Sequence, residues 1–320
     1  LYLQFWKLYK RPPIKEFQEY IIERKDLLVP QDIRERKGAF FTPRIWVELS
    51  QKYLTEYLGE NWQDEYFIWD CAAGTGNLLT GLTNKYNIYA STLDQSDVNV
   101  MHERIDHGAN LLHNHVFQFD FLNDDFTKLP QSLQDIINDK EKRKKLIIYI
   151  NPPYAEHGNR ATFAGEGEHK SSVANTSKIY AKFSKTVGTA TRELFAQFFL
   201  RVHEEIPDCH LASFSTLKFV NSQNFLKYRQ YFKGEYKKGF ICKANTFDNV
   251  KGNFPIGFLI WDLSKKTEIK KVETDVVNEN SEFIGLKNFY AFGSKDFISS
   301  WLRKFYDKEK LNELDSKKKT

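Results

Sequence analysis

The chain is poor in cysteine, with only Cys71, Cys209 and Cys242 in 320 residues. They are odd in number and lack the Cys-x-x-Cys or Cys/His spacing of a zinc site, so we expect neither a disulfide framework nor a metal site. No apolar run approaches the roughly 20 residues that cross a bilayer. The N-terminus also lacks the order of a signal peptide, so we expect a soluble protein of the cytoplasm.

The chain also has only a small excess of positive over negative charge. The 47 Lys and Arg residues against 42 Asp and Glu residues give a net charge of +5, which suits an anionic partner without identifying one. The hydrophobic content of 41% and the aromatic content of 15% are typical of globular proteins, which excludes a disordered or collagen-like chain. The chain has room for about two domains. It begins at Leu1, which we interpret as a processed or excised start.

Short apolar runs alternate with helical or polar stretches along the chain. Apolar residues at helical spacing predict a helix over 43–58, with Thr42 as its N-cap. Seven apolar runs predict strands: 66–69, 88–93, 116–119, 146–150, 211–217, 239–247 and 256–263. The last two form a predicted hairpin. The alternation indicates an α/β fold whose sheet is mostly parallel, ends in an antiparallel hairpin and carries helices on both faces.

A glycine-containing turn follows the first predicted strand. Asp70 ends that strand, and Gly74 and Gly76 precede a predicted helix that carries Leu78 and Leu79. Glycines let the backbone turn tightly and approach a ligand, as in dinucleotide-binding folds. The third glycine of the dinucleotide pattern is missing, and the Asp70 carboxylate would repel a diphosphate. The turn therefore favours a cationic or zwitterionic ligand.

The tetrapeptide Asn151-Pro152-Pro153-Tyr154 follows the fourth predicted strand. Two consecutive prolines fix the backbone and donate no N–H, so the tetrapeptide is a stiff bracket. It offers the Asn151 side-chain oxygen and the Pro152 carbonyl as acceptors, with an aromatic ring beside them. These features predict a binding site for a planar amino group.

With these motifs in this order, the sequence resembles the S-adenosylmethionine-dependent DNA adenine-N6 methyltransferases of bacterial restriction-modification systems. Residues 38–43 resemble the motif that those enzymes place before the cofactor turn, and residues 70–76 resemble the turn itself. Asp120 and Phe121 resemble the pair that holds the cofactor's adenine, and residues 151–154 the catalytic motif. The similarity covers about residues 33–264. It implies a Rossmann-like methyltransferase fold, and methyl transfer to the N6 amine of an adenine flipped out of a specific DNA sequence.

The resemblance also implies a role for each matching residue. The catalytic residues are Asn151, Pro152, Pro153 and Tyr154, with Tyr154 stacking on the flipped base. S-adenosylmethionine, which leaves as S-adenosylhomocysteine, is held by Phe41, Thr42, Asp70, Ala72, Gly74, Gly76, Asp94, Asp120 and Phe121. Relatives carry an acidic residue where this chain has Thr92, so the ribose contact of Asp94 stays open. The second aromatic against the base is Phe254, with Phe247 as the alternative.

We expect three parts in the chain. They are an N-terminal helical adjunct (1–37), a catalytic domain (38–264) and a C-terminal extension (265–320) that begins a target-recognition region. Within the catalytic domain, residues 155–191 have little periodicity, which predicts an insert loop whose Lys and Arg residues contact DNA. Double-stranded DNA is the expected partner. The resemblance also implies a restriction endonuclease, or a nuclease or recognition domain, outside this chain.

Two other functions stay open. The same tetrapeptide serves methyltransferases that act on a glutamine side chain or on an RNA base amine. A non-catalytic DNA-binding subunit that kept the methyltransferase fold is the third reading, although the intact tetrapeptide argues against it.

Overall fold

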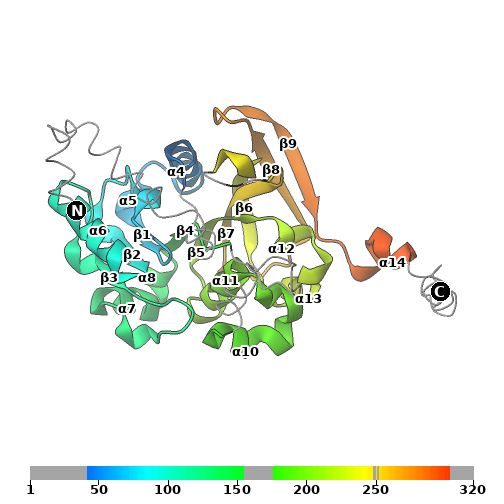
Figure 1. The fold of residues 1–320 in the computed structure, drawn as a ribbon, viewed down its shortest axis with the longest axis horizontal. Coiled ribbons are helices and arrows are strands. Elements are labelled where there is room, and N and C mark those ends of the chain that lie inside the picture. Colours follow the sequence, from blue (N-terminus) through cyan, green and yellow to red (C-terminus); the bar gives the residue numbers. More distant parts are fainter. Residues whose placement is uncertain (1–41, 155–175, 248–249, 251, 303–320) are drawn as a thin grey trace, which may run out of the picture.

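A computed structural model describes residues 42–154, 176–247, 250 and 252–302. The N-terminal adjunct and Phe41 lie outside these residues. The strands are β1 (Phe67–Asp70), β2 (Ile88–Thr92), β3 (Val116–Gln118), β4 (Leu146–Ile150), β5 (His210–Thr216), β6 (Glu235–Lys243), β7 (Pro255–Asp262), β8 (Lys271–Val277) and β9 (Phe283–Tyr290). They form one sheet in the order β3-β2-β1-β4-β5-β7-β6-β8-β9 (Figure 1).

The helices follow the predicted alternation in the first half of the chain. They are α4 (Arg44–Leu58), α5 (Trp62–Glu65), α6 (Gln95–Asp106), α7 (Gln131–Asn138), α8 (Lys140–Arg143), α10 (Lys178–Val187), α11 (Leu194–Glu205), α12 (Lys218–Asn221), α13 (Leu226–Tyr231) and α14 (Ile298–Leu302). Within the described part of the chain, none of them is long and apolar enough to cross a bilayer.

Parallel pairing joins the five strands β3, β2, β1, β4 and β5, and β7 then runs antiparallel between β5 and β6. Every residue of β2 and β4 is buried, because helices cover both faces of the sheet at these strands. The predicted α/β fold with a mostly parallel sheet and antiparallel strands near its C-terminal end is therefore confirmed.

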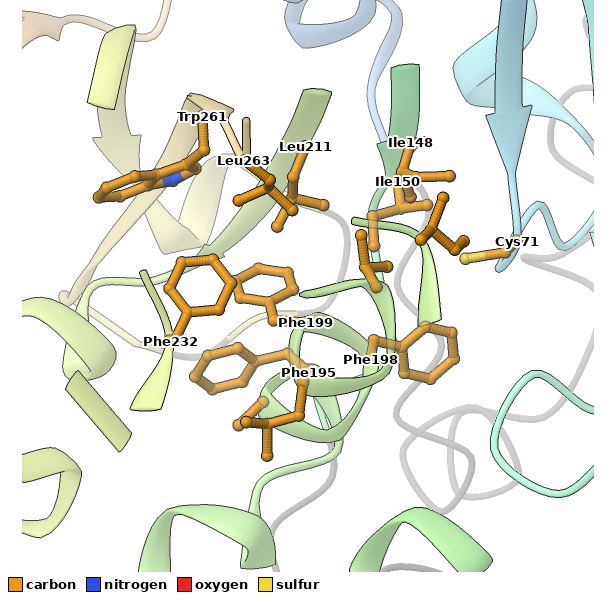
Figure 2. Close-up of a cluster of buried hydrophobic side chains, with 14 of the residues drawn as sticks. Cys71, Ile148, Ile150, Phe195, Phe198, Phe199, Leu211, Phe232, Trp261 and Leu263 are labelled. Atoms are coloured by element: carbon orange, nitrogen blue, oxygen red, sulfur yellow. The ribbon is translucent and has the colours of Figure 1, made fainter. Parts of the chain in front are cut away.

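Two hydrophobic clusters lie on the two faces of the sheet. On one face, Phe195, Phe198 and Phe199 of α11 pack in the cluster that holds Ile148 and Ile150 of β4 (Figure 2). On the other face, a separate cluster combines residues of α4, α5 and α6 with the alternate residues of the same strands: Trp46, Trp62, Met101, Ile68 and Ile147. Successive residues of a central strand therefore point into the two clusters in turn. The predicted helices on both faces of the sheet are confirmed.

The sheet has nine strands where the sequence predicted seven. The two additional strands, β8 and β9, form an antiparallel hairpin, and β8 pairs in parallel with β6 through Phe240 and Asp275. Val272, Thr274 and Val277 of β8 are buried, whereas Lys271 and Glu273 are exposed. These charged residues hid the strand in the sequence, because a strand with one face toward solvent mixes polar with apolar residues.

The range predicted as an insert loop is partly helical. Residues 155–175 lie outside the described residues, but α10 occupies Lys178–Val187. Ser177 caps this helix by accepting a hydrogen bond from the Tyr180 N–H at 2.9 Å. Ile179, Phe183 and Val187 are buried at four-residue spacing, and so few apolar positions gave only a weak helical pattern in the sequence.

Candidate active site

The carboxyl ends of four parallel strands meet at one edge of the sheet. Trp69 of β1 lies opposite Ile148 of β4, and Asp70 lies opposite Ala90 of β2. The predicted cofactor turn and the Asn-Pro-Pro-Tyr tetrapeptide therefore leave neighbouring strands on the same side. In open α/β sheets, ligands bind in the crevice at this edge.

Asp70 begins the glycine-containing turn and is only 1% exposed. Its Oδ1 accepts a hydrogen bond from the Ala72 N–H at 3.0 Å. Burial raises the pKa of the Asp70 carboxyl to about 7, and that hydrogen bond opposes the shift without cancelling it. A cation bound beside this carboxyl would stabilise its ionised form and lower its pKa again.

The two glycines of the turn adopt left-handed backbone conformations. Gly74 has a φ of 52° and Gly76 a φ of 83°, which side chains other than hydrogen disfavour. A Cβ built on Gly74 would have no heavy atom within 4 Å, so the backbone there faces open space. A Cβ on Gly76 would lie 3.2 Å from the Met101 sulfur, so Gly76 lets the turn pack on α6.

The helix predicted after the turn is absent from this described segment, and a single 3₁₀ turn, Asn77–Leu79, takes its place. Arg104 of α6 holds the turn instead, donating to the Thr75 carbonyl at 2.5 Å and to Asn77 Oδ1 at 3.1 Å. Sequence reasoning missed Arg104, since no motif marks an arginine that lies 29 residues from its partner.

The predicted ribose residue, Asp94, is half-buried and is the N-cap of α6. Thr92, where the resemblance led us to expect an acid, directs its hydroxyl to Asp97 Oδ2 at 3.5 Å. Asp97 therefore brings a second carboxylate to this strand end. Leu93 between them is 57% exposed, an apolar side chain at the ligand edge that the sequence did not single out.

Asp120 lies in a tight turn after β3. Its Oδ1 accepts from the Leu122 N–H at 3.0 Å, and its Oδ2 accepts from Asn123 Nδ2 at 2.8 Å. A carboxylate has about four acceptor positions, so two stay available for a ligand. Phe121 is buried, and its ring stacks on Phe198 with centroids 5.0 Å apart. The Phe121 ring therefore packs into the protein core.

The Asn151 side chain is held at both ends. Its Nδ2 donates to Thr42 Oγ1 at 2.8 Å, and its Oδ1 accepts from Tyr154 Oη at 2.8 Å. Pro152 is buried, whereas Asn151, Pro153 and Tyr154 are half-buried. The crowded surroundings raise the pKa of the Tyr154 phenol well above its ordinary value, so this hydroxyl stays protonated as a donor.

The structure separates the two candidates for the second aromatic. Phe254 is 45% exposed and precedes β7, whose first residues pair with the carboxyl end of β5. Phe247 is 1% exposed and packs against Trp46 and Phe214 in the core. Of these two candidates, Phe254 is the one whose ring is exposed.

Two of the Lys residues expected to contact DNA, Lys178 and Lys185, lie exposed on α10. Lys182, on the same helix, forms ion pairs with Glu204 and Glu205 of α11 at 3.5 and 3.7 Å. The charge of Lys182 is therefore partly compensated. Arg160 and Lys170 lie outside the described residues.

No protein-family model and no curated protein sequence matches this chain. Among solved structures, the cryoEM structure of a DrdV–DNA complex has a TM-score of 0.57 and 16% identity, over 86% of this chain and 32% of that chain. A nuclease-deletion mutant of the Type ISP restriction-modification enzyme LlaGI, in complex with a DNA substrate mimic, has a TM-score of 0.55 and 12% identity, over 91% and 33%.

A methyltransferase subunit of a type I restriction-modification system from Streptococcus thermophilus has a TM-score of 0.51 and 16% identity, over 80% of this chain and 50% of that chain. The chain thus spans 32 to 50% of the length of these proteins. At these identities, the likeness shows that the chain shares its fold with these three restriction-modification structures.

Proposed function

We propose that the protein transfers a methyl group from S-adenosylmethionine to the N6 amine of an adenine in DNA, as part of a restriction-modification system. The observation that carries the proposal is the hydrogen-bonded group of Thr42, Asn151 and Tyr154 at the end of β4, beside the glycine turn of β1. This group presents amide and carbonyl acceptors next to a turn that suits a cationic ligand.

The chemistry of Asn151 follows from its acceptor. An exocyclic adenine amine is a weak nucleophile because its lone pair is delocalised into the ring. Hydrogen bonds from its two N–H groups to Asn151 Oδ1 and the Pro152 carbonyl would localise the lone pair and stabilise the positive charge that develops on nitrogen. Thr42 holds the amide in place, so little reorganisation is needed during the reaction.

The residues at the strand ends fit S-adenosylmethionine. The buried Asp70 carboxyl suits the cationic methionine end, and the open space at Gly74 lets a ligand approach the backbone. Asp94 and Asp97 would accept from the ribose hydroxyls, and Asp120 from the adenine amine. When bound, the cofactor supplies a methyl group activated by its sulfonium.

Base capture would rest on aromatic rings. An adenine inside a duplex cannot reach this edge, so the enzyme would flip it out at a cost of a few kcal/mol. Tyr154 and Phe254 would stack on the extruded base and recover part of this cost. The half-buried Tyr154 and the exposed Phe254 support this assignment.

The test is transfer of tritiated methyl from S-adenosylmethionine to unmethylated genomic DNA, followed by nucleoside analysis. We expect label in N6-methyladenine from the wild-type chain and none from Asn151→Ala, which should still bind the cofactor. Asn138→Ala is the control, because Asn138 is exposed at the end of α7.

Each contrary result points to a different function. Cofactor binding without DNA methylation would redirect the proposal to a glutamine side chain or an RNA base amine. A chain that binds DNA but no cofactor would be a non-catalytic subunit. Undiminished transfer by Asn151→Ala would remove Asn151 from the chemistry.

A further inference from the structure

Arg201 of α11 is an arginine almost entirely removed from water, with a side chain that is 5% exposed. Burying a guanidinium is costly unless its donors are satisfied. Its Nη1 donates to the Phe121 carbonyl, its Nη2 to the Asp124 carbonyl at 2.7 Å, and its Nε to Glu205 Oε2 at 2.9 Å. Two of these three contacts bind backbone in one turn.

The guanidinium also lies among the rings around that turn. Its central carbon is 5.1 Å from the centroid of Phe121, 5.8 Å from that of Phe119 and 4.3 Å from that of Phe126. These distances fall within the range of cation–π attraction. Phe198, three residues before Arg201 on the same face of α11, stacks on Phe121.

The turn that Arg201 holds is the one that carries Asp120. Inside it, the Asp124 N–H donates to the Asp120 carbonyl at 2.8 Å, and Asn123 Nδ2 donates to Asp120 Oδ2. Arg201 donates its hydrogen bonds to two other carbonyls of this turn, those of Phe121 and Asp124. The planar fork of an arginine reaches both at once, and a lysine has one point charge that cannot.

The charge of Arg201 also reaches the turn after β1. Burial and the charge of Asp70 raise the pKa of the Cys71 thiol, and the charge of Arg201 opposes this shift. In Figure 2, Phe198 of α11 points toward Cys71. One face of α11 therefore underlies both turns assigned to the cofactor.

We infer that Arg201 is a positioning residue for the cofactor pocket: it fixes the Asp120–Asp124 turn so that the Asp120 carboxylate faces the adenine end of the cofactor. This inference rests on the proposed function. Arg201 acts through the turn, since its side chain is buried and three of its N–H donors bind the Phe121 and Asp124 carbonyls and Glu205.

The experiment compares Arg201→Lys with a matched arginine at the opposite edge of the sheet. Arg143 of α8 is also largely buried and donates to the carbonyls of Ile137 and Pro207 at 2.7 and 2.6 Å. It precedes β4, so it braces backbone far from the ligand edge. Arg143→Lys therefore reproduces the loss of stability without touching the cofactor turn.

The measurements are calorimetric titration with S-adenosylhomocysteine, urea unfolding and hydrogen exchange of residues 119–125. We expect Arg201→Lys to weaken binding about tenfold, the effect of losing one charge-assisted hydrogen bond. Arg143→Lys, at a similar loss of stability, should bind within about twofold of the wild type. Exchange in the Asp120–Asp124 turn should quicken only in Arg201→Lys.

Unchanged binding by Arg201→Lys, or equal weakening by Arg143→Lys, would overturn the inference. A wild-type chain that binds neither S-adenosylmethionine nor its product would instead remove the proposed function. If the wild type binds no cofactor, hydrogen exchange still tests whether Arg201 holds the Asp120–Asp124 turn. Unchanged exchange in Arg201→Lys would contradict that role, and faster exchange would support it.

Discussion

Thr42 accepts a hydrogen bond from Asn151 Nδ2 at 2.8 Å across 109 residues of sequence. The resemblance assigned Thr42 to the cofactor, but in the structure its hydroxyl contacts the proposed catalytic amide. The predicted N-cap role of Thr42 is wrong, because α4 begins at Arg44 and its N-cap is Pro43, without a side-chain cap hydrogen bond. The contact instead joins the segment before α4 to the residue that follows β4. Thr42 therefore has a positioning role toward Asn151, in addition to the cofactor role that stays a prediction.

Removing the Thr42 hydroxyl should slow transfer. In Thr42→Val the Asn151 amide loses one of its two anchors, so we expect kcat to fall about tenfold while the cofactor Kd changes little. Thr42→Ser keeps the hydroxyl and should retain most activity. Steady-state methyl transfer and calorimetric titration measure the two quantities. A loss of cofactor affinity with unchanged kcat would return Thr42 to the cofactor site.

Tyr154 has two separable features, its ring and its hydroxyl. Tyr154→Phe loses the hydrogen bond to Asn151 Oδ1 but keeps the ring, so we expect a modest fall in kcat and an unchanged KM for DNA. Tyr154→Ala also loses the stacking surface, worth about 1 to 3 kcal/mol per base, and should raise KM for DNA by about 5- to 150-fold. Equal effects of both substitutions on cofactor affinity would argue against base stacking.

The buried Asp70 carboxyl should make stability depend on pH. Its pKa rises from 3.8 unfolded to about 7 folded, so between these values the folded chain holds a proton that the unfolded chain has lost. Its contribution to stability is present below the lower pKa and is lost as pH rises to the upper one.

Asp70→Asn keeps the oxygen that accepts from Ala72 and removes the titration. Its free energy of unfolding relative to the wild type should increase with pH and level off above about 7, by on the order of 4 kcal/mol at most. Urea unfolding across this pH range measures the difference, in which other titrating groups cancel. A difference that does not vary with pH would show that Asp70 has an ordinary pKa.

The affinity for the cofactor should depend on the ionisation of the Asp70 carboxyl. A cation binds the ionised carboxylate, so the affinity of the wild type for S-adenosylmethionine should increase as pH rises through about 7. Asp70→Asn should bind weakly at every pH. Calorimetric titration at several pH values measures both, and a pH-independent wild-type affinity would remove Asp70 from the ligand site.

Alanine substitutions at Phe254 and Phe247 should affect different properties, DNA binding and stability respectively. Phe254 is exposed, so its loss should change the free energy of unfolding by only about 0.5 kcal/mol while raising KM for DNA. Phe247 is buried, and its loss should cost about 3 to 5 kcal/mol of stability. An unchanged KM in Phe254→Ala would mean that another ring packs the base.

Local patterns in the sequence were sufficient for the central strands and the two motif-bearing turns. The run 146–150 predicts β4 to the residue, because a strand buried on both faces is apolar throughout. Gly74 and Gly76 predicted the turn, since few other residues adopt its φ values. The order of the motifs was enough to indicate the fold.

Tertiary structure decided what supports these turns. Arg104, Arg201 and Thr42 each contact a partner distant in sequence, and periodicity carries no signal for such pairs. It also decided the strands β8 and β9, because β8 pairs with β6 and β9 pairs only with β8 in the described sheet. Local backbone preference determined where the motifs turn, and long-range packing determined which side chains hold them in place.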